Sequence, residues 1–241
     1  MYSQNRTQNG TPNGTYTDST ALAITNTFFR KVYLWMTAGL ALTALASFLM
    51  LSSASAQQLI FGNRMIFYGL IIAELGLVIA MSAAINRISA STATLMFLGY
   101  SALNGVTFAA IFMIYTNSSI ASAFLVTAGT FGAMSVYGYA TKRDLTGWGS
   151  FLFMGLVGII IASVVNIFLQ SEMIYWVTSY IGVFVFVGLT AYDTQKIKQI
   201  GQAGFANEQD RHKAAILGAL RLYLDFINLF LMLLRIMGNR R

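Results

Sequence analysis

The sequence contains no cysteine, one proline (Pro12) and one histidine, and only 10% of its 241 residues are charged. The absence of cysteine excludes disulfides, thiolate metal sites and cysteine nucleophiles. A soluble domain would carry about 25% charged residues. The common nucleotide-binding and hydrolase patterns GxxxxGK(S/T), HExxH and GxSxG are also absent. These absences favour a non-enzymatic membrane protein that needs no cofactor.

The composition is instead dominated by apolar residues, which make up 56% of the chain, and the net charge is +7. The basic residues stand singly or in pairs between apolar runs, as topology determinants do in membrane proteins. A surface for nucleic acid is therefore not expected.

Seven apolar runs are long enough to cross a bilayer, which takes about 20 residues of helix. The runs are continuous, unlike the alternating strands of an outer-membrane barrel. They predict an all-α, polytopic membrane protein with seven transmembrane helices. The runs cover residues 32–51, 65–85, 92–115, 120–140, 150–169, 174–192 and 214–237.

The first 28 residues are polar and rich in Asn, Thr and Gly, so we expect a disordered cytoplasmic tail there. This segment has no early apolar stretch, as a secretory signal would need. The sequence thus predicts two parts, a tail over residues 1–28 and a transmembrane domain over residues 29–241.

The distribution of Lys and Arg between the loops predicts the orientation of the bundle. Ten basic residues fall on the side of the N-terminus and three on the other side, which places the N-terminus in the cytoplasm and the C-terminus outside. The ten are Arg6, Arg30, Lys31, Arg87, Lys142, Arg143, Lys196, Lys198, Arg211 and Lys213, and the three are Arg64, Arg240 and Arg241.

A few ionisable residues fall within the apolar runs. Glu74 lies in the middle of the second run, Asp193 follows the sixth, and Arg221 and Asp225 belong to the seventh. A carboxylate at the bilayer centre costs about 2.5 kcal/mol or more. Each of these groups must therefore be paired, protonated or in contact with water.

The seventh run carries a polar stripe, because Arg221, Asp225, Asn228, Met232 and Arg235 follow a 4-3-4-3 spacing and share one helix face. Thirteen residues separate the two arginines, which is roughly 20 Å against a hydrocarbon core of about 30 Å. A helix facing lipid would be mismatched, so we expect the seventh helix at the centre of the bundle.

Asp193 and Asp225 reach a similar depth if the sixth helix continues past Tyr192. Two carboxylates in contact at low dielectric cannot both stay ionised cheaply and therefore share a proton. They would also attract a hard cation. Ca²⁺ takes 6–8 oxygen ligands, and two Asp with Asn228 supply too few for tight binding. The pair predicts a weak, transient calcium site, as a permeation pathway needs.

Structural interpretations stay open beside these functional ones. Asp225 pairs with Arg221 as a packing element, Asp193 is an ordinary interfacial residue, Glu74 packs in its protonated form, and Arg87 only determines topology. Two aspartates on adjacent spans would also suit an aspartyl membrane protease, although no GxGD-like run accompanies either one.

Four segments resemble the Bax inhibitor-1 (transmembrane Bax-inhibitor-motif) family, specifically its bacterial branch. They are VYLWMTAGLALTALAS at 32–47, FGAMSVYGYATKRDLTGWG at 131–149, VGLTAYDTQKI at 187–197 and LYLDFINLFLMLLRIMGNRR at 222–241. The similarity covers nearly everything after residue 28.

The resemblance implies a seven-helix bundle with the last helix central and a pH-sensitive calcium leak across the cytoplasmic membrane. It implies that Asp193 and Asp225 form the pH sensor and that Arg87 latches the closed state. Arg221, Asn228 and Glu74 are expected to support the site. The expected partners are the lipid bilayer, calcium and protons. The alternative is a non-transporting regulator that binds other membrane proteins, such as a membrane protease.

Overall fold

The computed structural model describes the backbone of residues 13–241 and the side chains of residues 23–241. The described chain folds into eight α-helices and contains no β-strand apart from an isolated bridge between Tyr115 and Arg240. The helices are α1 (Asn13–Leu51), α2 (Ala54–Phe61), α3 (Arg64–Ala84), α4 (Ala90–Ile114), α5 (Asn117–Ala140), α6 (Thr146–Leu169), α7 (Glu172–Ala203) and α8 (Glu208–Met237).

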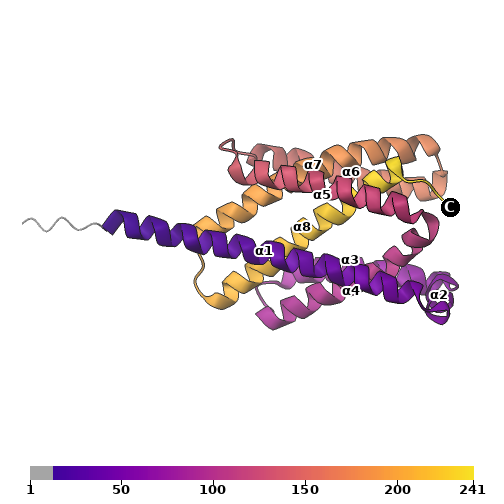
Figure 1. Cartoon of the computed structure of the whole chain (residues 1–241), viewed down its shortest axis with the longest axis horizontal. Helices are drawn as coiled ribbons and strands as arrows, with labels where there is room; N and C mark the ends of the chain where they lie inside the picture. Colours follow the sequence, from indigo (N-terminus) through magenta and orange to yellow (C-terminus); the bar gives the residue numbers. More distant parts are fainter. Residues whose placement is uncertain (1–12) are drawn as a thin grey trace, which may run out of the picture.

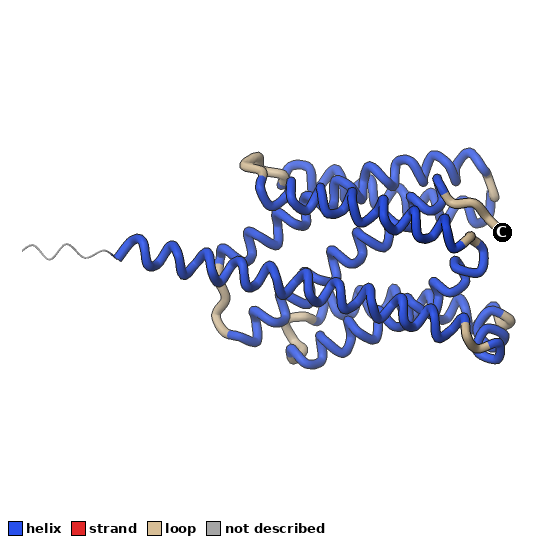
Figure 2. The backbone as a smooth tube through the Cα atoms, viewed as in Figure 1, coloured by secondary structure: helices blue, strands red, loops and turns tan. Residues whose placement is uncertain are grey.

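Seven of these helices, all except α2, are long and apolar enough to cross a membrane. The predicted all-α fold with seven spans is therefore confirmed. The short helix α2 was not predicted and occupies the first loop, where the Ser53 side chain caps its first turn. The loops gather at the two ends of the bundle (Figure 2), as expected for antiparallel spans.

Two predicted boundaries need correction. Residues 1–12 of the expected disordered tail lie outside the described residues, but the chain is helical from Asn13, well before residue 28. Packing explains part of this extension, because Phe28 is fully buried and its ring lies 4.8 Å from that of Phe205. Helix α7 runs to Ala203 rather than ending near Tyr192, so Asp193 lies inside a continuous helix.

Side-chain caps explain where most of the helices begin. Ser89, Thr116, Ser171 and Asn207 each accept a hydrogen bond from a backbone N–H of the following first turn, which satisfies a donor that the helix itself leaves free. Helix α6 has no such cap. Instead, the side chain of Gln195 on α7 forms two hydrogen bonds with the backbone of the loop that precedes α6. These bonds anchor the start of α6 to α7.

Helix α8 is the most enclosed span. Of its most apolar window, 67% is buried, against 6% to 39% for the other spans. It crosses diagonally between α1, α3 and α4 on one side and α5, α6 and α7 on the other (Figure 1). It packs against α1, α4, α5 and α7, whereas α3 packs mainly on α4, and α6 on α7. Most of α8 therefore faces other helices rather than the outside of the bundle.

Small residues allow two close helix contacts. A Cβ atom on Gly138 of α5 would overlap the backbone of Ala191 on α7, and one on Gly105 of α4 would overlap Thr43 of α1. This is the close approach that small residues permit in lipid. Gly129 and Gly132 face open space, so they do not contribute to packing.

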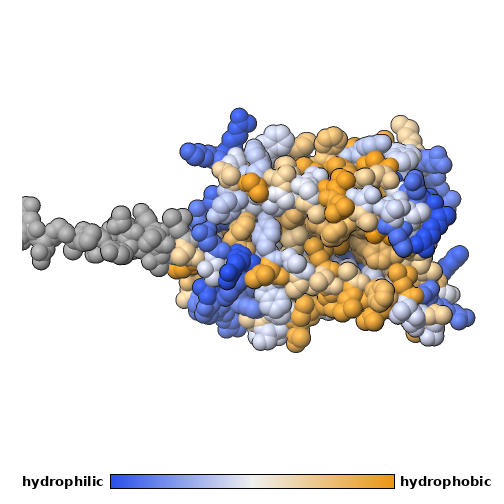
Figure 3. All heavy atoms as spheres, in the orientation of Figure 1, coloured by the Kyte–Doolittle hydropathy of each residue, from blue (hydrophilic) through white to orange (hydrophobic). Residues whose placement is uncertain are grey.

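The outer surface has the pattern of a membrane protein. On the face that Figure 3 shows, apolar residues cover the middle and hydrophilic residues lie at both ends. Large apolar side chains of the spans are strongly exposed, among them Ile72 at 68% and Leu125 at 70%. In a bilayer these side chains contact lipid, as expected for a membrane protein. The polar groups inside the bundle are not expected on that basis and need a separate explanation.

Candidate functional site

The polar stripe of α8 meets α7 at an ion pair. Nη1 of Arg221 lies 4.0 Å from Oδ1 of Asp193, and the exposed fractions of the two side chains are 43% and 14%. This contact is possible because α7 continues past Tyr192 as a helix. The structure therefore pairs Arg221 with Asp193 on the neighbouring span, and it records no ion pair between Arg221 and Asp225 among the described residues.

Asp225 lies beside this ion pair and deeper in the bundle. Only 4% of its surface is exposed, and its carboxylate interacts electrostatically with Asp193 and with Arg221. Within the described part of the chain, its Oδ2 atom is buried and has no hydrogen-bond partner. Two carboxylates and one arginine thus come together inside the bundle.

These groups line one large cavity of about 1290 Å³ between α3, α4, α6, α7 and α8. The rest of its lining is mostly aliphatic and aromatic. The polar side chains therefore face a largely apolar cavity. Every residue of the predicted α8 stripe belongs to the lining. The polar and charged lining residues include Glu74, Tyr100, Asp193, Arg221, Asp225, Asn228 and Arg235.

Glu74 lies on the α3 side of this cavity. Thr107 of α4 donates a hydrogen bond to Oε1 of Glu74 at 3.0 Å, so the carboxyl group is held toward the interior rather than toward lipid. Asn228 uses its amide differently, donating to the carbonyl oxygen of Leu224 at 2.8 Å. Its side-chain oxygen therefore stays available to the cavity.

Arg235 marks the opposite end of the cavity from Asp193. It also lines a second cavity of about 550 Å³ near the C-terminal end of α8, together with Glu172, Tyr175 and Arg240. The Arg235 guanidinium lies 5.5 Å from the centre of the Tyr175 ring, a cation–π contact. A positive charge thus stands in the wall between the two cavities.

Arg87 does not join the site in this conformation. It lies in the turn after α3, is exposed, and takes part in none of the ion pairs of the described residues. It is also absent from the cavity lining. The cation beside Asp193 is Arg221, because α8 runs alongside α7, whereas α3 packs mainly on α4.

The site offers few ligands for a resident metal. Among the described residues, no three His, Cys, Asp or Glu side chains come together. Asp193 and Asp225 supply two carboxylates, and Asn228 supplies one amide oxygen. This set falls short of the 6–8 oxygen ligands that Ca²⁺ takes.

Comparison with known proteins gives the family. Residues 25–241 match the family model described as inhibitor of apoptosis-promoting Bax1. The inner membrane protein YbhL of Escherichia coli K12 is 58% identical over 216 residues, which cover 89% of this chain and 92% of that protein.

The chain belongs to the Bax inhibitor-1 family. A Borreliella burgdorferi relative is 48% identical over 220 residues, covering 91% of this chain and 95% of the relative. A membrane protein of Streptococcus pyogenes serotype M1 is 42% identical over 216 residues, covering 89% and 93%. With its seven apolar helices, this member of the family is a multi-pass membrane protein.

The role of Arg235 in the cavity wall was not predicted from the sequence, where it was treated as an interfacial end of the span. The available signal was its place in the 4-3-4-3 stripe. Tyr100 was also missed, because nothing in the third apolar run distinguishes a tyrosine that faces a cavity from one that packs between helices.

Proposed function

We propose that this protein is a cation leak channel, permeable to Ca²⁺, in the cytoplasmic membrane, and that a proton shared by Asp193 and Asp225 controls its opening. The observation that carries the proposal is the buried Asp225 carboxylate, which lies beside Asp193 in a cavity that Glu74, Arg221 and Arg235 also line. An intramembrane carboxylate is costly, and it points to an ion or proton pathway.

The control would work through local charge. With one proton on the pair, the remaining negative charge is balanced by Arg221, which lies 4.0 Å from Asp193. Loss of that proton leaves two carboxylates against one arginine, and their repulsion favours a different arrangement of α7 and α8. The extra negative charge would also attract a divalent cation into the cavity.

Flux measurements on the purified protein in liposomes test this function. With a Ca²⁺ dye inside, the wild type should show flux that changes with pH, because two interacting carboxylates titrate as a pair. Asp193→Asn and Asp225→Asn should each remove the pH dependence. Asp144→Asn is the matched control, because Asp144 lies in the exposed loop between α5 and α6.

Three results would contradict the proposal. Flux with unchanged pH dependence in both cavity variants would exclude the sensor role. Absence of flux at every pH, together with co-purification of a membrane protease, would support the regulator function instead. Cleavage of a membrane substrate that requires either aspartate would indicate a protease.

The proposed orientation, with the N-terminus in the cytoplasm, has its own test because the chain lacks cysteine. Single cysteines can be placed at Asp144, in the loop with Lys142 and Arg143, and at Asn239, at the opposite end of the bundle. In intact spheroplasts a membrane-impermeant maleimide should label Asn239→Cys and spare Asp144→Cys. The reverse pattern would invert the orientation.

A further inference from the structure

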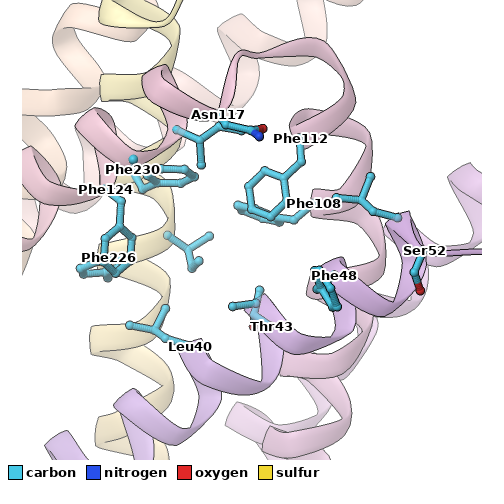
Figure 4. A pocket seen from close by; sticks show the side chains of 15 residues that line it. Leu40, Thr43, Phe48, Ser52, Phe108, Phe112, Asn117, Phe124, Phe226 and Phe230 are labelled. Carbon is cyan, nitrogen blue, oxygen red and sulfur yellow. The ribbon is translucent and has the colours of Figure 1, made fainter.

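A second hollow lies on the other side of α8 from the charged cavity. It has a volume of about 580 Å³, within the roughly 300–1,000 Å³ of small-molecule sites. Aromatic side chains from α1, α4, α5 and α8 surround it (Figure 4). We call it the phenylalanine groove, after Phe48, Phe108, Phe112, Phe124, Phe226 and Phe230.

The groove opens sideways, toward lipid. Its two rims are α1, which packs on α4, α7 and α8, and α5, which packs on α7 and α8. The rim side chains Phe48 and Phe124 are 68% and 47% exposed. An apolar hollow of this kind does not hold ordered water, so in a bilayer the molecules available to fill it are lipids.

The size of the groove favours one acyl chain over a protein helix. A transmembrane helix is about 10–12 Å wide and about 30 Å long, which is several times the volume of the groove. A single hydrocarbon chain needs only a narrow apolar channel. The one buried polar group in the lining is the Thr43 hydroxyl, which is hydrogen-bonded to the Tyr223 hydroxyl at 2.6 Å. The molecule that fills the groove therefore need not supply a hydrogen-bonding group there.

The polar end of the groove carries positive charge. Asn117, at the start of α5, lines the groove and accepts a hydrogen bond from Nη2 of Arg241 at 2.7 Å. The backbone N–H of Arg241 donates to the carbonyl oxygen of Ile114 at 2.8 Å, which holds the chain end in place. The neighbouring Arg240 points elsewhere, donating to the Tyr175 hydroxyl at 3.2 Å in the cavity that it shares with Glu172.

We propose that the phenylalanine groove binds one acyl chain of an anionic phospholipid, whose phosphate is held by Arg241 at the C-terminal end of the bundle. The guanidinium group matches a phosphate better than any other side chain does. The chain would then lie against Phe226 and Phe230, on the opposite face of α8 from Asp225. This inference does not depend on ion transport.

Lipid retention measured by native mass spectrometry tests the proposal. The full chain is reconstituted in nanodiscs with equal amounts of phosphatidylglycerol and phosphatidylcholine and then released in mild detergent. The wild type should retain one phosphatidylglycerol. Ala121→Phe fills the groove from α5 and should reduce retention at least tenfold. Ser122→Phe is the matched control, because Ser122 neighbours Ala121 but does not line the groove.

Two further variants keep the test decisive if Ala121→Phe does not fold. Ala44→Phe fills the groove from the α1 side and should have the same effect. Arg241→Gln leaves the apolar walls intact and should lower the preference for phosphatidylglycerol about fivefold, the usual contribution of one basic residue at a membrane surface.

Several outcomes would overturn the inference. Retention that is unchanged in both groove-filling variants excludes the groove as the lipid site. Equal retention of both lipids by the wild type excludes recognition of the anionic headgroup. A lipid-free dimer that Ala121→Phe or Ala44→Phe dissociates would identify a second copy of the chain as the occupant.

Discussion

The two faces of α8 are made of different residues and contact different surroundings. One face carries Asp225, Asn228 and Arg235 and lines the charged cavity. The other carries Phe226 and Phe230 and lines the phenylalanine groove. One helix thus separates a polar hollow from an apolar one, and the difference suggests that the aromatic face stabilises the helix while the polar face serves function.

Physical chemistry supports this division. In lipid there is little hydrophobic drive between helices, so close packing must stabilise the bundle. The Phe226 ring lies 5.5 Å from that of Phe124 and 5.4 Å from that of Phe131, both on α5. Charged groups, by contrast, cost free energy in the membrane and are kept where function requires them.

The largest effect should come from the aromatic face. Phe226→Ala removes two ring contacts of a buried side chain and is expected to cost about 3 kcal/mol, or roughly 10 °C in melting temperature. Asp225→Asn should change the stability by no more than about 1 kcal/mol, because Oδ2 of Asp225 forms no hydrogen bond that could be lost.

Thermal unfolding of the detergent-solubilised protein, followed by circular dichroism, compares the two variants directly. Leu125→Ala on the lipid-facing side of α5, where Leu125 is 70% exposed, is the control and should be nearly neutral. A larger loss of stability in Asp225→Asn than in Phe226→Ala would reverse the assignment of the two faces.

A smaller effect is expected from the cation on the polar face. Arg221 favours the deprotonated form of the aspartate pair, so Arg221→Gln lets the proton persist to higher pH. The pH of half-maximal Ca²⁺ flux should move upward by about one unit, since Arg221 is partly exposed and its charge is partly screened. Arg221→Lys keeps the charge and should restore most of the wild-type midpoint. A shift to lower pH would contradict the proposed role of the arginine.

Much of this arrangement could be predicted from the sequence. Continuous apolar runs gave the seven spans, since their length matches the bilayer, and the 4-3-4-3 spacing placed Arg221, Asp225 and Asn228 on one helix face. The position of Asp193 depended on the end of the sixth helix. Hydropathy alone ends that helix near Tyr192, whereas packing and hydrogen bonds continue it to Ala203.

Other features depend on tertiary contacts that leave no periodic pattern in the sequence. The pairing of Asp193 with Arg221, rather than with Arg87, follows from which helix lies beside α7. The groove lies among α1, α4, α5 and α8, and its phenylalanines come from all four of these helices. Gly129 and Gly138 look alike in the sequence, yet only Gly138 faces a helix backbone.

The smallest effect should come from an aspartate outside both faces. Hydrogen bonds from the hydroxyl and the backbone N–H of Thr146 hold the pKa of Asp144 below its ordinary value. A lowered pKa means that the charged form stabilises the fold above the ordinary pKa, and that this contribution is lost as the pH falls through the lowered one.

Asp144→Ala should therefore lower the melting temperature slightly at pH 7. The difference in melting temperature between this variant and the wild type should disappear below about pH 4. Flux and its pH midpoint should stay unchanged, because Asp144 is fully exposed and does not line the charged cavity. A difference that widens on acidification would contradict the sign of this linkage. A shift in the flux midpoint would mean that the pH response is not confined to the polar face of α8.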